Sequence, residues 1–241
     1  MKRFVLPLLL LTSVASFAQS GFLKKASGIL NKATGGNTSA LSNDDIVAGL
    51  KEALTVGATN GANKLSAVDG FFANAAIKVL MPPEAKKVEN ALRTAGMGKL
   101  VDNAILSMNR AAEEASKSAA PIFVNAVKTM SIQDALGILK GSDTAATGYL
   151  RSKTVSALTT AFRPVIDTAL QKTSATQYWK TVFETYNKLP TTFNKINPDL
   201  AGYVTEKSLS GMFYQVAQEE QKIRKDPAAR VSDILKKVFG S

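Results

Sequence analysis

Residues 203–225 have the sequence YVTEKSLSGMFYQVAQEEQKIRK, and this stretch decides the fold class. Its apolar side chains recur at intervals of three and four residues, at Leu209, Met212, Phe213, Val216 and Ile223. That spacing places them on one face of an α-helix, because an α-helix has about 3.6 residues per turn. We therefore expect a long helix over 198–225, about 42 Å in length.

The same spacing continues through most of the chain. It recurs at Val101, Ala104, Ile105, Met108, Ala112 and Ala115. A second long helix is expected over 143–172, kinked at Pro164. No stretch shows the alternation of apolar and polar residues that is typical of a strand. The sequence therefore predicts one all-α domain over 41–241, a single bundle of about eight to ten helices.

Residues that begin and end helices support these boundaries. Ser42 with Asp45, and Ser131 with Asp134, have the spacing of a capping box. Further signals are Pro82-Pro83, Asn197-Pro198 and Asp226-Pro227 at helix starts, and Gly96, Gly141 and Gly240 at helix ends.

The first 18 residues have the three parts of a secretory signal peptide. Lys2 and Arg3 form a positive start, residues 4–14 are almost wholly apolar, and Ser16 and Ala18 are small residues at the cleavage positions. The apolar run is shorter than the roughly 20 residues that a transmembrane helix needs, which disfavours the alternative of an uncleaved anchor. We therefore expect an exported protein whose mature chain of 223 residues has no transmembrane segment.

Residues 19–40 are expected to precede the domain as an amphipathic helix and a linker. Within 20–34 one face carries Phe22, Leu23, Ala26, Ile29 and Leu30, with Lys24, Lys25 and Lys32 off it. Residues 35–39, GGNTS, are typical of a flexible linker. The helix could lie on a membrane surface or dock on the domain.

Composition excludes several kinds of active site. The chain has no cysteine and no histidine, which excludes Ser-His-Asp and Cys-His catalysis, disulfides, the usual zinc sites and a lipid anchor on an N-terminal cysteine. It has no Ser-x-x-Lys pattern and no calcium loop, and Gly96-Met97-Gly98-Lys99 is better explained as a helix end and turn than as a phosphate-binding loop. We expect no metal, no cofactor and no catalytic residue other than a glutamate acid or base.

The positive charge points to an anionic partner. The net charge is +11, and loss of Lys2 and Arg3 with the signal peptide would leave +9. For an exported protein, anionic lipid or an acidic envelope component is a better match than nucleic acid. The expected basic surface comprises Lys222, Arg224, Lys225, Arg230, Lys236 and Lys237. The alternative is a helix packed on the bundle with a solvated basic outer face.

Several polar residues fall on apolar helix faces, where burial is costly without a partner. They are Asn109, Arg110, Glu113, Thr147, Arg151, Glu206 and Glu220. They could line a ligand pocket, or they could form an internal ion-pair network that fixes helix packing. We expect Arg151 to pair with Glu220 or Glu206, and Arg110 to form an exposed i,i+4 pair with Glu114.

A stripe of mostly aromatic residues lies between the two long helices. It consists of Tyr178, Trp179, Val182, Phe183 and Tyr186. Core packing explains such a stripe most simply, and a hydrophobic pocket for an acyl chain or sterol-like ligand is the alternative.

Ordered blocks over almost the whole mature chain resemble the bacterial family called domain of unknown function 4197. The blocks are AGLKEAL at 48–54, DGFFANAAIKVLMP at 69–82, SMNRAAEEA at 107–115, MSIQDALGIL at 130–139, DTAATGYLRSKT at 143–154, YVTEKSLSGMFYQVAQEEQKIRKDPAAR at 203–230 and ILKKVFG at 234–240. The resemblance implies an exported helical protein of a Gram-negative bacterium, located in the periplasm. It implies no activity, substrate or catalytic residue.

These observations leave three hypotheses for function. The first is a non-enzymatic envelope protein that binds an apolar ligand, an anionic surface or a protein partner. The second is a Glu-dependent hydrolase or lyase acting on an envelope polymer, which requires a solvent-open cleft containing Glu113, Glu206 or Glu220. The third is a purely structural or chaperone-like role.

Overall fold

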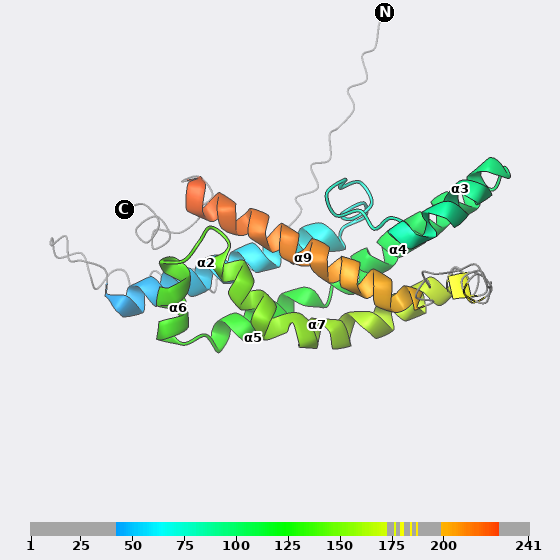
Figure 1. The fold of residues 1–241 in the computed structure, drawn as a ribbon. Coiled ribbons are helices and arrows are strands. Elements are labelled where there is room, and N and C mark those ends of the chain that lie inside the picture. The colour runs from blue at the N-terminus through cyan, green and yellow to red at the C-terminus, as the bar shows by residue number, and fades with distance from the viewer. Residues whose placement is uncertain are drawn as a thin grey trace, which may run out of the picture. The chain divides into compact units, whose positions relative to one another are not determined.

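The computed structural model describes residues 42–172 and 199–226, together with Thr176, Trp179, Lys180, Glu184 and Asn187. Within these residues the chain has seven α-helices, one short 3-10 helix and no strand, which confirms the all-α prediction (Figure 1). The helices are α2 (Asn43–Ser66), η1 (Pro83–Ala85), α3 (Lys86–Thr94), α4 (Gly98–Ser116), α5 (Ala119–Lys128), α6 (Ile132–Leu139), α7 (Ala145–Lys172) and α9 (Leu200–Lys225). Seven is fewer than the expected eight to ten; the signal peptide, the helix over 20–34 and the residues after Asp226 lie outside the described part.

The helix boundaries follow the capping signals closely. Ser42 accepts a hydrogen bond from the Asp45 N–H at 3.1 Å, and Asp45 accepts one from the Ser42 N–H at 3.2 Å. Ser131 and Asp134 form the same reciprocal pair at the start of α6. Each capping box satisfies donors that the first helical turn leaves unpaired.

The long C-terminal helix begins slightly later than expected. Asp199 is its N-cap and accepts a hydrogen bond from the Gly202 N–H at 2.8 Å, so α9 runs over Leu200–Lys225. The other long helix, α7, contains Pro164 as predicted.

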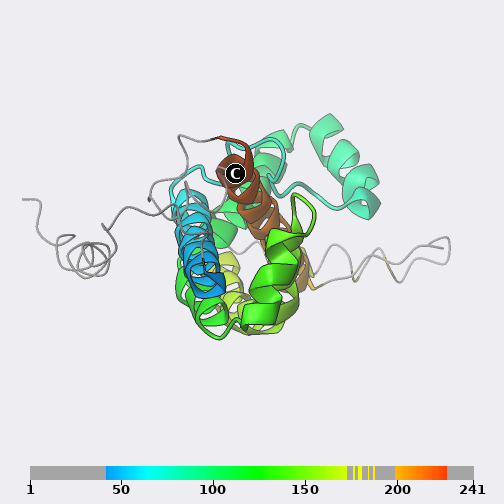
Figure 2. The same cartoon turned by 90° about the vertical axis from the view of Figure 1, so that its left-hand side faces the viewer.

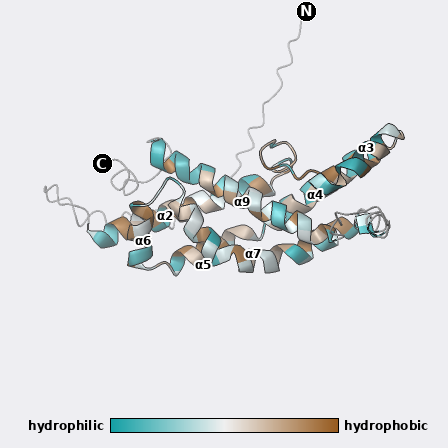
Figure 3. Cartoon of the chain, in the orientation of Figure 1, coloured by the Kyte–Doolittle hydropathy of each residue, from teal (hydrophilic) through white to brown (hydrophobic). Residues whose placement is uncertain are grey.

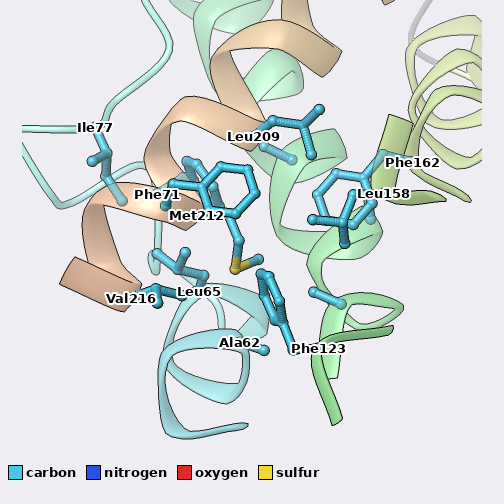
Figure 4. Packing of buried hydrophobic residues seen from close by; sticks show 14 of the residues in the cluster. Ala62, Leu65, Phe71, Ile77, Phe123, Leu158, Phe162, Leu209, Met212 and Val216 are labelled. Atoms are coloured by element: carbon cyan, nitrogen blue, oxygen red, sulfur yellow. The ribbon is translucent and has the colours of Figure 1, made fainter. Parts of the chain in front are cut away.

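The helices pack around one apolar core. α9 lies along both α7 and α2, and α4 lies along α7 (Figures 1 and 2). Between them Phe71, Phe123 and Met212 are fully buried (Figure 4). Phe213 is buried as well, and its ring meets that of Phe123 edge-on at a centroid distance of 5.9 Å. Burial of each such side chain stabilises the fold by about 1.5–3 kcal/mol.

Hydrophilic and hydrophobic residues alternate along the helices, as expected of amphipathic segments with one buried face (Figure 3). The C-terminal end of α9 is mostly hydrophilic. In the part of the chain that the structure describes, no helix has the length and apolarity to cross a membrane.

Residues 67–82 depart most clearly from the helical prediction. Residues 67–77 form a series of turns and 78–82 have no regular structure, although Phe71, Ile77 and Val79 are buried. The turns begin where the chain reverses against the end of α2: Asp69 has a φ of 67°, and a Cβ at Gly70 would lie only 2.5 Å from the Lys64 carbonyl oxygen. Such a reversal interrupts a helix, and we call residues 67–82 the α2–η1 loop.

Candidate functional site

Asn109 on α4 fixes the later part of the α2–η1 loop. Its Oδ1 accepts a hydrogen bond from the Val79 N–H at 2.9 Å, and its Nδ2 donates to the Val79 carbonyl at 2.8 Å. Nδ2 also donates to the Ile105 carbonyl at 2.7 Å. The amide is fully buried and its hydrogen-bonding groups are occupied, so it pairs with the loop backbone much as a neighbouring strand would.

Glu113, one helical turn further along α4, fixes the earlier part of the loop. Its Oε1 accepts hydrogen bonds from the N–H groups of Phe71 and Phe72 at 3.1 and 3.2 Å. Its Oε2 accepts one from Arg110 at 2.6 Å, and Arg110 also donates to Asp69 at 2.7 Å. These hydrogen bonds to Glu113 and Asp69 raise the pKa of Arg110.

The expected pair of Arg110 with Glu114 was therefore wrong. Glu114 accepts from Lys117 at 2.6 Å on the exposed side of α4, whereas Arg110 turns towards the loop. The loop supplies the Asp69 carboxylate and, through Phe71 and Phe72, orients Glu113, so a long-range arrangement outweighs the weak local i,i+4 preference.

The opposite side of the loop lies on α9, where Gly211 permits close approach. A Cβ at Gly211 would lie 2.6 Å from Cε1 of Phe71 and 3.2 Å from Cβ of Ile77. Tyr203, two turns earlier on α9, donates its hydroxyl to the Leu80 carbonyl at 2.8 Å. The loop is thus held between α4 and α9.

Gly211→Ala should destabilise the protein by about 1–3 kcal/mol, because the added methyl group overlaps the buried Phe71 ring and forces it to move. Urea unfolding followed by circular dichroism measures the change. Gly148→Ala is the matched control. Gly148 is likewise in a helix, but it is exposed, and an added Cβ there would have nothing within 4 Å. The control should be stabilised by up to about 1 kcal/mol. Equal effects of the two changes would contradict the close contact.

A pocket of about 430 Å³ lies between the α2–η1 loop and α9. Its lining includes Lys78 and Leu80 from the loop and Tyr203, Lys207, Ser210 and Tyr214 from α9. The Lys78 ammonium lies 3.7 Å from the centroid of the Phe72 ring, and that of Lys207 lies 5.6 Å from the Tyr203 centroid. Neither lysine forms a salt bridge with any carboxylate of the described residues.

Tyr203 lines this pocket and is held in place by its contacts with Leu80 and Trp179. Burial, followed by the negative charges of Glu84 and Glu206, raises the pKa of Tyr203 to about 12, so the hydroxyl stays protonated and donates to Leu80. The Tyr203 ring stacks on the buried Trp179 at a centroid distance of 6.5 Å. Trp179 therefore packs as a core residue; the other members of its stripe, Tyr178, Val182, Phe183 and Tyr186, lie outside the described residues.

Glu220 forms a second buried polar cluster at the start of α7. It accepts hydrogen bonds from the N–H groups of Ala146 and Thr147 at 3.0 and 2.9 Å, and from the Thr147 hydroxyl at 2.8 Å. Arg224 donates to the same carboxylate at 2.9 Å and to the Ile138 carbonyl at 3.0 Å. Glu220 thus caps α7 from another helix, because the first turn of α7 leaves these N–H groups unpaired.

Arg151 and Glu206 were wrongly placed inside the protein. Arg151 is exposed, with its guanidinium carbon 4.4 Å from the centroid of the Phe213 ring, and Arg224 takes the expected place beside Glu220. The buried face of α7 includes Leu150 and Thr154, and Arg151 lies beside this face rather than on it. Glu206 is exposed for the same reason, since it follows the buried Thr205 and each residue advances the helix by about 100°.

The seven predicted polar residues therefore do not line one pocket. Asn109, Arg110 and Glu113 hold the α2–η1 loop, Thr147 and Glu220 join α7 to α9, and Arg151 and Glu206 lie on the surface. Glu113 and Glu220 are buried and already bind two or more donors each, which does not suit either for general acid or base work on a substrate. Among the described residues no three potential metal ligands cluster together.

The expected basic surface is largely neutralised where the structure describes it. Lys222 pairs with Glu219 at 3.0 Å, Arg224 with Glu220 at 2.9 Å, and Lys225 with Asp143 at 2.9 Å. Arg230, Lys236 and Lys237 lie outside the described residues.

The sequence did not predict the pocket residues Lys78, Lys207, Ser210 and Tyr214. The one pattern that relates any of them is the three-four spacing of Lys207, Ser210 and Tyr214, which places these three on the outer face of α9.

Comparison with known proteins places the chain in a family. A family model described as "Protein of unknown function (DUF4197)" matches residues 40–240, nearly the whole chain. No curated protein and no solved structure matches it. The match covers both the α2–η1 loop and α9, which form the pocket. The chain therefore belongs to the DUF4197 family of proteins of unknown function.

Proposed function

We propose that this protein is a non-enzymatic binding protein of the bacterial envelope, and that it binds the anionic group of its ligand, a phosphate or a carboxylate, in the pocket between the α2–η1 loop and α9. One observation carries the proposal. Two lysines without a carboxylate partner among the described residues, Lys78 and Lys207, line the same concave site. The other described lysines singled out as a basic surface are paired.

The pocket has the chemistry that an anionic group needs. Each ammonium supplies three donors, and the Ser210 and Tyr214 hydroxyls add two more. Hydrogen bonds from a charged donor to an anion are about twice as strong as neutral ones. A volume of about 430 Å³ lies within the range of small-ligand sites. The site therefore suits a ligand with one compact anionic group.

A larger groove between α4 and α7 supports the proposal less. It has a volume of about 800 Å³ and is lined mainly by apolar side chains such as Leu106 and Val165. Of its charged members, Arg110 and Glu114 already pair with Glu113 and Lys117, which leaves Lys172 as its one lysine without a carboxylate partner among the described residues. It therefore offers an anion fewer free donors than the smaller pocket does.

The proposed location follows from the N-terminal sequence. Residues 1–18 have the parts of a signal peptide, which would place the protein in the periplasm. Anionic lipid headgroups and acidic polymers are the abundant anions there, and nucleic acid is not expected. A net charge of +9 after cleavage favours encounter with such partners.

Lys78→Gln/Lys207→Gln should weaken binding of simple anionic probes by at least about tenfold, since two charge-assisted contacts are lost. The probes are inorganic pyrophosphate and an oligogalacturonate, titrated by calorimetry at low ionic strength. Lys140→Gln/Lys153→Gln is the matched control: it removes the same charge from two exposed lysines that line neither this pocket nor the groove between α4 and α7, and Lys153 lies 5.6 Å from the Tyr149 ring as Lys207 does from Tyr203. An equal loss in the control would show general attraction rather than a site, and no binding of either probe would contradict the proposal.

A further inference from the structure

We infer that the anionic group belongs to lipid headgroups of a bilayer, and that the face carrying Lys78, Leu80, Lys207 and Tyr214 docks on an anionic membrane surface. This inference rests on the proposed function, because the same two lysines bind the headgroup phosphate. It adds the nature of the ligand and a role for two apolar side chains at the rim of the pocket.

Leu80 and Tyr214 are exposed although both are large. The exposed fractions are 54% for Leu80 and 43% for Tyr214, and both side chains line the pocket together with the lysines. Single exposed apolar residues are common on protein surfaces. Here two exposed large side chains lie in one pocket with two lysines that have no carboxylate partner among the described residues, and this clustering sets them apart from scattered surface residues.

The backbone holds Leu80 in its outward position. Val79, the residue before it, exchanges two hydrogen bonds with the buried Asn109. The Leu80 carbonyl accepts a third from the Tyr203 hydroxyl, and Pro82, two residues on, is buried. The chain is therefore fixed on both sides of the Leu80 side chain, which cannot fold back into the core without breaking these contacts.

A bilayer uses both parts of this surface, whereas a soluble polyanion uses only one. Lysine ammonium groups bind headgroup phosphates while leucine and tyrosine side chains enter the boundary between headgroups and acyl chains. A polyanion in solution would gain from Lys78 and Lys207 and would leave Leu80 in water. Glu84 and Glu206 lie near enough to Tyr203 to affect its pKa and moderate the positive potential, so binding should be reversible and sensitive to salt.

Co-sedimentation of the purified protein with vesicles tests the inference. Vesicles of phosphatidylethanolamine with about one-third phosphatidylglycerol should bind it, and vesicles of phosphatidylcholine should bind it at least about tenfold less, since each lysine near an anionic surface contributes about fivefold. Lys78→Gln/Lys207→Gln should reduce binding to the level seen with phosphatidylcholine.

Leu80→Ser should reduce vesicle binding by about threefold or more, because it removes the inserting side chain and leaves the charges in place. Ile132→Ser is the matched control: Ile132 is also a branched apolar residue, 51% exposed, at the start of α6 outside the pocket, and its loss should have no effect.

The outcomes separate the two proposals. If pyrophosphate or oligogalacturonate binds through Lys78 and Lys207 but vesicles do not, or if Leu80→Ser and Ile132→Ser bind vesicles equally, the bilayer inference is wrong and the anion site stands. If neither vesicles nor probes bind at low ionic strength, both are wrong. Thermal melts of each variant confirm that these surface changes leave the fold intact.

Discussion

Glu220→Ala should lower the free energy of unfolding by about 3–5 kcal/mol, because it breaks a buried ion pair and removes a shared hydrogen-bond acceptor. The carboxylate binds two backbone N–H groups and a hydroxyl of α7 and the guanidinium of Arg224. Removing it leaves the three α7 donors without this acceptor, and the Arg224 side chain, 13% exposed, loses its ion pair with Glu220. Urea unfolding followed by circular dichroism measures the change.

Two further variants isolate the cause of that loss. Glu220→Gln keeps the shape and part of the hydrogen bonding, so its loss should be intermediate, about 1.5–3 kcal/mol. Glu206→Ala on the same helix removes an exposed glutamate and should change stability by less than about 0.5 kcal/mol. If Glu220→Ala and Glu206→Ala proved equal, Glu220 would not hold α7 to α9.

The helix boundaries were predictable because their signals are local. Ser42 and Asp45 are three residues apart, and their reciprocal hydrogen bonds need no other part of the chain. The turn after α3 is local in the same way: Gly96 has a φ of 79°, and the Met97 N–H donates to the Leu92 carbonyl at 2.8 Å. Together they form the usual glycine stop of a helix.

The α2–η1 loop could not be predicted in this way. Its shape depends on Glu113, 42 residues from Phe71, and on Tyr203, 123 residues from Leu80. The spacing of apolar residues indicates which face of a helix is buried. It does not indicate which other segment of the chain covers that face. The pocket at Lys78 and Lys207 exists only because this loop lies on α9, and the spacing of residues along α9 does not indicate that contact.

The polar residues on apolar faces were recognised in part. Asn109, Glu113, Thr147 and Glu220 are buried, as their positions on apolar faces indicated. Their partners were not predictable, since three of these side chains bind backbone groups that have no sequence signature. Of the two interpretations, the described contacts support a network that fixes packing, and the proposed anion site lies beside that network.

Glu113→Ala tests whether that network also supports the proposed anion site. It should cost about 2–4 kcal/mol of stability, because the buried Phe71 N–H and the partly buried Phe72 N–H lose their acceptor and Arg110 loses one of its two carboxylate partners. Amide hydrogen exchange at Phe71 and Phe72 should rise more than exchange along α7. Binding of pyrophosphate should weaken as well, although Glu113 does not line the pocket, since the α2–η1 loop positions Lys78.

Glu114→Ala is the control for this effect, because Glu114 is the next residue along α4 and carries the same charge on the exposed side. Its pairing with Lys117 is worth at most about 1 kcal/mol, and neither amide exchange in the loop nor probe binding should change. A Glu113→Ala variant with unchanged exchange at Phe71 and Phe72 would show that Asn109 and Tyr203 hold the loop unaided. A loss of stability without any loss of binding would separate the network from the site, because Lys78 would then keep its position without Glu113.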